Sequence, residues 1–160
     1  IKKTILFLVL NFSALAIGGL FTGPGVSSSW YHELNQAPWT PPGWVFGFAW
    51  TLIMLCFSFY MAYLISSKEN RKTIIVLFSI QWILNVAWNP IFFHFQFVSL
   101  GLICISALTI LVAYFLFKFR KGRSKIYQYI VHVYIEYLFH RDWFFICYFI
   151  SLRPETSYSS

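Results

Sequence analysis

The sequence has little charge. Charged residues make up only 11% of its 160 residues, and only five residues are acidic. Soluble domains carry about 25% charged residues, so this composition excludes an ordinary soluble domain. It also excludes a disordered chain, because 59% of the residues are hydrophobic and 22% are aromatic. With so few charges, the net charge of +7 does not indicate a nucleic-acid-binding arm.

Cysteine and catalytic motifs are also scarce. The three cysteines lie inside apolar runs and form no CxxC pair, at positions Cys56, Cys104 and Cys147. We interpret them as small buried hydrophobic residues. There is no P-loop, Rossmann glycine pattern, nucleophile elbow or catalytic triad. His132, Glu136 and His140 share one helical face, but the further ligand of a zinc signature is missing, so we predict no metal site.

Long apolar runs are what the sequence does contain. A bilayer core about 30 Å thick requires about 20 apolar residues per helix. Five stretches meet this requirement: residues 4–21, 44–66, 73–93, 98–117 and 126–150. We therefore predict an all-α integral membrane protein, with one five-helix domain over residues 1–150 and a polar tail at 151–160. An uncleaved signal sequence is the alternative for the first run, because Lys2 and Lys3 precede it.

The basic residues fall on one side of the predicted membrane. Ten of the twelve Lys and Arg residues precede the first span or lie between spans two and three or spans four and five. The opposite connections, 22–43 and the turn around His94, hold none. The positive-inside rule predicts a cytoplasmic N-terminus and an outer C-terminus, and the short loops favour a bacterial plasma membrane. The cluster from Lys118 to Lys125 is expected to contact anionic lipid headgroups.

Tryptophan is concentrated in one half of the chain, where six of the seven residues fall between Trp30 and Trp88. An interfacial aromatic belt explains those near the start of the second span. Trp50 and Trp82 fall inside spans, where an indole N–H needs a partner or a ligand. Both the lining of a cavity and simple packing are consistent with these two positions.

Polar side chains mark one face of the third span. Gln81, Asn85 and Trp88 recur at i, i+4 and i+7, which places them on the same side of a helix. Amides at membrane depth either form interhelical hydrogen bonds or line a binding site, and the spacing leaves both roles open. Near the end of this span, Pro90 removes a backbone donor, which predicts a kink or a carbonyl released into a cavity.

The connection before the second span is rich in proline and aromatic residues. Pro41 and Pro42 fix two φ angles directly before the helix. An aromatic loop of about 20 residues is longer than a connection needs, so we predict an ordered binding loop, with a plain interfacial cap as the alternative.

Two blocks of residues resemble the TspO/MBR family, also known as translocator proteins, tryptophan-rich sensory proteins or peripheral-type benzodiazepine receptors. The first block enters the second span and consists of Trp30-Tyr31, Leu34, Pro38, Pro41-Pro42, Phe46 and Trp50. The second block lies on the third span and consists of Gln81, Leu84-Asn85, Trp88 and Phe92-Phe93.

The resemblance implies a five-helix bundle, usually a homodimer, that binds tetrapyrroles such as protoporphyrin and haem, and also sterol-like ligands. The tetrapyrrole is a ligand here, and no resident cofactor is implied. The pocket would lie under the first loop, lined by Trp39, Phe46, Trp50, Gln81, Asn85 and Trp88. Some relatives are credited with light-dependent porphyrin breakdown. A receptor, sensor or transporter is therefore the main expectation, and an enzyme with Trp50 as its catalytic residue is the alternative.

The resemblance covers residues 5–125, and the fifth span departs from the family's P-Y-x-x-W pattern. Tyr134 fits the pattern, but Tyr137 stands at the tryptophan position. Glu136, Arg141 and Asp142 together oppose insertion by about 9 kcal/mol, against about 6 kcal/mol gained from the apolar residues. This stretch is either a fifth helix that needs partners or a frameshifted or diverged tail. In the second case the protein would be a non-functional family member.

Overall fold

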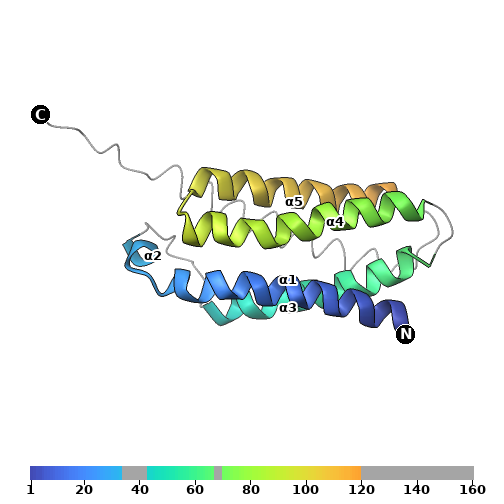
Figure 1. The fold of residues 1–160 in the computed structure, drawn as a ribbon, viewed down its shortest axis with the longest axis horizontal. Helices are drawn as coiled ribbons and strands as arrows, with labels where there is room; N and C mark the ends of the chain where they lie inside the picture. The colour runs from blue at the N-terminus through green and yellow to red at the C-terminus, as the bar shows by residue number, and fades with distance from the viewer. Residues whose placement is uncertain (34–42, 67–69, 120–160) are drawn as a thin grey trace, which may run out of the picture.

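The computed structural model describes residues 1–33, 43–66 and 70–119 (Figure 1). These residues form helices and connections, with no strand among them. The helices are α1 (Lys2–Val26), α2 (Ser29–Glu33), α3 (Gly43–Leu64), α4 (Arg71–Asn89), the π-helical turn η1 (Pro90–His94) and α5 (Val98–Lys118).

Four of these helices are long and apolar enough to cross a membrane. They are α1, α3, α4 continued by η1, and α5, and they overlap the first four predicted spans. The all-α membrane fold expected from the apolar runs is thus confirmed. The predicted fifth span, residues 126–150, lies outside the described residues.

The first helix is longer than predicted. It was expected to end at Phe21, but α1 continues to Val26 with Pro24 inside it. A proline inside a helix removes one hydrogen bond and strains the preceding turn. Tertiary packing offsets this cost, because Gly25 lies so close to Phe93 of η1 that a Cβ atom would come within 2.4 Å of the ring. Part of the predicted first loop is therefore helix.

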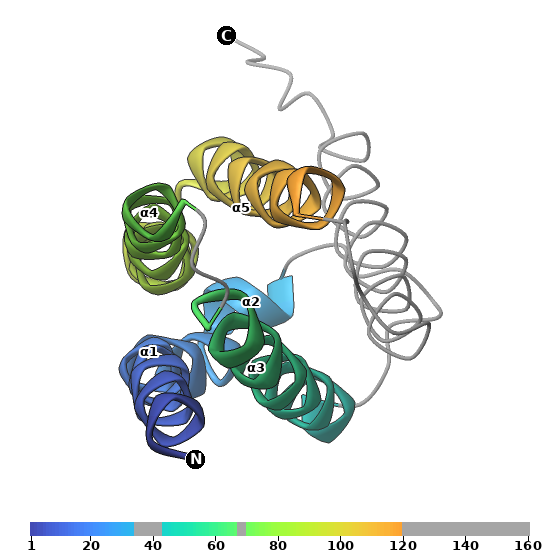
Figure 2. The same ribbon diagram turned by 90° about the vertical axis from the view of Figure 1, so that its right-hand side faces the viewer.

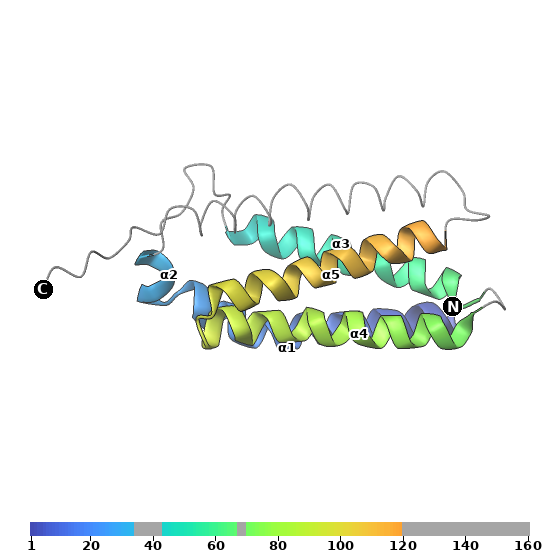
Figure 3. The ribbon, with the colours of Figure 1, turned by 90° about the horizontal axis from the view of Figure 1, so that it is seen from above.

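The long helices run alternately up and down, so that α1 and α4 run in the same direction (Figure 1). Seen end-on, α1 lies between α3 and α4, and α4 lies between α1 and α5 (Figure 2). The short helix α2 lies at the end of the bundle opposite the N-terminus (Figures 1 and 3). This arrangement brings the interior faces of four helices together along the bundle axis.

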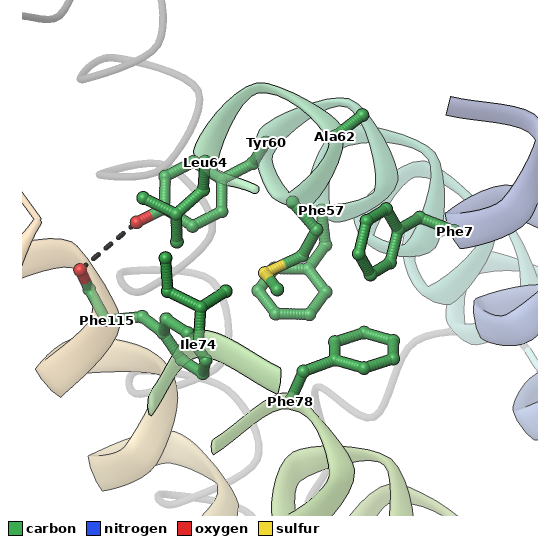
Figure 4. Packing of buried hydrophobic residues seen from close by; sticks show 9 residues of the cluster. Phe7, Phe57, Tyr60, Ala62, Leu64, Ile74, Phe78 and Phe115 are labelled. Carbon is green, nitrogen blue, oxygen red and sulfur yellow. Dashed lines mark hydrogen bonds between the residues drawn. The ribbon is translucent and has the colours of Figure 1, made fainter. Parts of the chain in front are cut away.

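The interior at the N-terminal end of the bundle is aromatic. Phe7 and Phe78 meet edge to face with ring centroids 5.0 Å apart, and Phe57 packs against Phe78 and Phe115 (Figure 4). The Tyr60 hydroxyl donates a hydrogen bond to the Phe115 carbonyl oxygen at 3.1 Å. Since a buried hydroxyl needs a partner, this bond completes the contact between α3 and α5.

A second apolar cluster lies further along the bundle. It consists of Ile53, Met54, Leu108 and Val112, with Leu15, Trp50 and Leu84 packed against it. This cluster joins all four long helices next to the tryptophan and amide residues that the sequence singles out.

The described basic residues gather at the end of the bundle that holds the N-terminus. They are Lys2, Lys3, Arg71, Lys72 and Lys118, at the ends of α1, α4 and α5 (Figure 1). Lys3 Nζ donates to Ser66 Oγ at 3.3 Å, which ties α1 to the end of α3. Among the described residues at the other end, Glu33 is the one residue with a full charge.

Candidate functional site

The interior face of α4 changes from apolar to polar along the helix. Its buried residues are Ile74, Phe78, Gln81, Asn85 and Asn89, spaced by three or four positions. The three amide side chains are exposed by only 1%, 4% and 7%, respectively. The predicted shared face of Gln81 and Asn85 is therefore present and fully buried.

Asn89 has a structural role. Its Nδ2 donates to the Asn85 carbonyl oxygen at 3.2 Å, and its Oδ1 accepts a hydrogen bond from Thr22 Oγ1 at 2.7 Å. This amide joins α1 to α4 by an interhelical hydrogen bond, which is one of the two roles that the sequence left open.

The other two amides retain hydrogen-bonding capacity. Asn85 Nδ2 lies 3.8 Å from Met54 Sδ, and a thioether sulfur is only a weak acceptor. Gln81 Oε1 is buried without a hydrogen-bond partner. A ligand with an oxygen acceptor at its edge would give Asn85 Nδ2 a stronger partner than this sulfur.

Trp50 and Trp88 form a stacked pair between α3 and α4. Their ring centroids are 5.9 Å apart, and the ring planes differ by 20°. Both side chains are partly buried. The ring centroid of Trp88 also lies 6.4 Å from that of Phe92 and 5.9 Å from that of Phe93. The pair joins α3 to α4 about one helical turn beyond Asn85.

The change from α-helix to π-helix at Pro90 sets the direction of the Phe92 and Phe93 rings. Pro90 has no N–H to continue the α-helical ladder, and the chain passes into the π-helical turn η1, in which Phe95 N bonds to Pro90 O at 3.0 Å. The sequence predicts a kink or a released carbonyl at Pro90, and the structure shows a π-helical turn there. This turn directs Phe92 and Phe93 toward α2 and toward the end of α1.

Aromatic contacts connect α2 to the same site. Trp30 lies 5.6 Å from Phe92, and Tyr31 lies 6.0 Å from Phe93, measured between ring centroids. Burial raises the pKa of the Tyr31 phenol above its ordinary value. Sequence reasoning did not assign these four residues to the site, although all of them belong to the two motif blocks that could have indicated it.

Trp82 is separate from this group. Its indole Nε1 donates to the Leu10 carbonyl oxygen of α1 at 2.8 Å, which satisfies the N–H within the protein. Of the two tryptophans that the sequence places inside spans, Trp82 is a packing residue and Trp50 belongs to the candidate site.

The structure brings Trp50 and Trp88 together, and Asn85 and Gln81 precede Trp88 on α4 by about one and two helical turns. Trp39 and the side chain of Phe46 lie outside the described residues. So do His132, Glu136 and His140. Among the described residues, no three His, Cys, Asp or Glu side chains lie close enough to hold a metal ion.

Residues 5–139 match the profile of the TspO/MBR family. The chain belongs to this family. The matched range reaches beyond residue 125, where the motif resemblance stops, so part of the predicted fifth span is included. As a TspO/MBR member with four apolar helices of membrane-spanning length, the chain is an integral membrane protein.

Individual family members are similar over much of their length. The tryptophan-rich protein TspO of Chlorobaculum tepidum is 33% identical over 117 residues, which cover 69% of this chain and 74% of that protein. The protein of the same name from Archaeoglobus fulgidus is 37% identical over 114 residues, covering 68% and 73%. The tryptophan-rich sensory protein of Cereibacter sphaeroides is 30% identical over 84 residues, or 52% of each chain.

Proposed function

We propose that this TspO/MBR protein is a membrane receptor or sensor that binds a tetrapyrrole, such as protoporphyrin or haem. The observation that carries the proposal is the stacked pair of Trp50 and Trp88 beside the buried amide of Asn85. The name of the Cereibacter relative, a tryptophan-rich sensory protein, supports a sensory role. Transport of the same ligand is a related role that would use the same site.

The chemistry of a tetrapyrrole suits these side chains. Its macrocycle is flat and apolar, and stacking between aromatic rings contributes about 0.5–1.5 kcal/mol beyond the burial of area. Its edge carries carboxylates, which are strong hydrogen-bond acceptors, whereas its pyrrole nitrogens point to the centre of the ring. Asn85 Nδ2 would donate to a carboxylate oxygen, which is a far better acceptor than the Met54 sulfur. Trp39, Phe46 and Gln81 are proposed to complete the site.

Sterol-like molecules are a second ligand class for the same surface, because they are also rigid, flat and largely apolar. They offer one hydroxyl to the amides instead of two carboxylates. We therefore expect them to compete with porphyrin for Trp50 and Trp88 and to depend less on Asn85.

The test is a titration of the detergent-solubilised protein with protoporphyrin in the dark. Quenching of the tryptophan fluorescence measures the binding. Saturable quenching is expected, with a Kd raised about fivefold to tenfold in Trp50→Phe and in Asn85→Ala. Trp82→Phe is the matched control, since its indole is bonded to the Leu10 carbonyl; its Kd should stay within twofold of the wild type. Quenching that does not saturate, or that Trp82→Phe weakens equally, would contradict the proposal.

Illumination separates a binder from an enzyme. The indole pair is oxidisable, and a bound porphyrin can act as a photosensitiser, so light-dependent porphyrin breakdown is the alternative function. Porphyrin absorbance that stays constant under light supports a receptor or carrier. Loss of absorbance in the wild type that is abolished in Trp50→Phe supports the enzyme, with Trp50 as its catalytic residue.

The basic end of the bundle is proposed to face the cytoplasm of a bacterial plasma membrane. Lys and Arg near the ends of membrane spans are retained on the cytoplasmic side, and the described cations gather at one end of the bundle (Figure 1). Anionic lipid headgroups would be their partners. We also propose a homodimer, and the mass of the detergent-solubilised protein measured by light scattering tests it.

A further inference from the structure

Two buried oxygen atoms among the described side chains have no hydrogen-bond partner. They are Asn11 Oδ1 on α1 and Gln81 Oε1 on α4. The two residues are exposed by 0% and 1%. A buried acceptor left unpaired destabilises the fold, because it loses its hydrogen bonds to water without gaining a protein partner. Two such atoms inside a membrane bundle therefore call for a donor that binds both.

The two residues lie at the same level of the bundle. The parallel helices α1 and α4 meet at Phe7 and Phe78, whose centroids are 5.0 Å apart. One turn further along, the Leu10 carbonyl oxygen accepts the Trp82 N–H at 2.8 Å. Asn11 follows Phe7 by four positions and Gln81 follows Phe78 by three, so helix geometry brings the two buried amides to the same level of the contact between α1 and α4.

The helix α3 packs against α1 (Figure 2) and contributes Ser58 to this junction. Asn11 Nδ2 donates to Ser58 Oγ at 2.8 Å. The Ser58 hydroxyl in turn lies 2.7 Å from the Met54 carbonyl oxygen and 3.2 Å from that of Phe7. One N–H of Asn11 and the Ser58 hydroxyl are therefore engaged with acceptors of α3 and α1. The unpaired atoms at this junction are the two acceptors Asn11 Oδ1 and Gln81 Oε1, so a bound species that supplies hydrogen atoms or positive charge would satisfy them.

We propose that one water molecule is bound at this junction and donates a hydrogen bond to Asn11 Oδ1 and another to Gln81 Oε1. Water carries two hydrogens, which matches the two acceptors, and buried waters in proteins serve otherwise unpaired polar groups. A sodium ion would also suit oxygen ligands. However, no carboxylate lies among the described residues of α1, α3 and α4, and a charge without a counter-ion is costly at membrane depth.

The bound water gives Asn11 and Ser58 a role that neither has through direct contacts alone. Asn11, Ser58 and the water form a continuous hydrogen-bonded group that holds the Gln81 amide from the side of α1. Asn11 is thus a positioning residue for Gln81. The inference requires only the buried junction and stands whether or not a tetrapyrrole is the ligand.

The experiment is nuclear magnetic resonance on the isotope-labelled wild type in lipid nanodiscs, measuring cross-relaxation from water to the side-chain NH₂ groups. Cross-peaks with the signs of a long-lived bound water are expected at Asn11 and Gln81. Asn89 is the matched control, because its amide is also buried but both of its polar atoms have protein partners. Relay through the Ser58 hydroxyl is excluded if the Gln81 cross-peak persists in Ser58→Ala.

Two results would overturn the proposal. Cross-relaxation between the Asn11 and Gln81 side chains, with no water cross-peak at either, would show a direct amide-to-amide hydrogen bond and a dry junction. Missing water cross-peaks together with shifts of these two NH₂ resonances when potassium is replaced by sodium would show a cation in place of water.

Discussion

The Asn89 side chain lies directly against Gly18, so closely that a Cβ atom on Gly18 would come within 2.5 Å of Asn89 Nδ2. The absence of a side chain at Gly18 lets α1 and α4 approach at this point. It leaves room for the amide that accepts the Thr22 hydrogen bond and donates to the Asn85 carbonyl. A small residue beneath a hydrogen-bonded amide is a common way to join membrane helices.

Gly18→Ala should therefore destabilise the bundle. The new methyl group would displace an amide that two hydrogen bonds hold in place, and overpacking of this kind costs about 1–3 kcal/mol. Gly19→Ala is the matched control, because nothing lies within 4 Å of a Cβ atom at Gly19. We expect Gly18→Ala to have a lower Tm than the wild type and Gly19→Ala to have an unchanged Tm. Circular dichroism of the proteins in detergent measures both values. Equal Tm values for both variants would show that Asn89 moves aside freely.

The Tyr60 hydroxyl provides a second stability test. Tyr60→Phe removes the hydrogen bond to the Phe115 carbonyl and keeps the ring, so the expected loss is about 0.5–1.5 kcal/mol. Tyr114→Phe, which changes an exposed tyrosine of α5, should cost less than about 0.5 kcal/mol. Unfolding by a graded increase of denaturing detergent measures both variants. A Tyr60 variant as stable as the wild type would mean that this bond adds nothing to the contact between α3 and α5.

The four long helices follow from the sequence because the length of an apolar run can be compared directly with the thickness of a bilayer. The end of α1 does not follow from it. Passage through Pro24 depends on Gly25 packing against Phe93, which is distant in the chain. Considered without this contact, Pro24 predicts that the helix ends before it.

Only part of the candidate site was predictable, because only part of it depends on local helix geometry. The spacing of Gln81, Asn85 and Trp88 is a local helical property. Gln81 and Asn85 are both buried on the interior face, whereas Trp88 is only partly buried. The different fates of Trp50 and Trp82 were not predictable, because the partner of Trp82 is a backbone carbonyl of α1. Asn11 and Ser58 were missed as well, although a single polar residue inside an apolar span is itself a signal of a buried contact.

Labelling from outside the cell tests the proposed orientation. Single cysteines are introduced by Ser27→Cys and Lys72→Cys, which lie at opposite ends of the bundle and are exposed. The native residues Cys56, Cys104 and Cys147 are first replaced by alanine. A membrane-impermeant maleimide applied to intact cells should label the first variant, and the second only after lysis. The reverse pattern would place the basic end outside.

Tyr31 makes the stability of the α2 contact depend on pH. Its phenol packs against Phe93, and burial raises its pKa above the ordinary value of 10.0. The unfolded chain therefore loses this proton at a lower pH than the folded protein does. Stability from the neutral phenol is complete below the ordinary pKa and declines as the pH rises from there through the raised folded value.

The Tyr31→Phe variant has no phenol to ionise at this position. Its stability should therefore fall less than that of the wild type as the pH rises. We expect the Tm of the wild type to fall more steeply than that of Tyr31→Phe between about pH 9 and pH 11, because the phenylalanine ring keeps the packing against Phe93 without the titrating group. A difference spectrum of the two proteins near the phenolate absorption band isolates the Tyr31 titration from that of the other tyrosines. If the curves of Tm against pH run parallel, the Tyr31 phenol ionises equally easily in the folded and unfolded states, and α2 does not shield it.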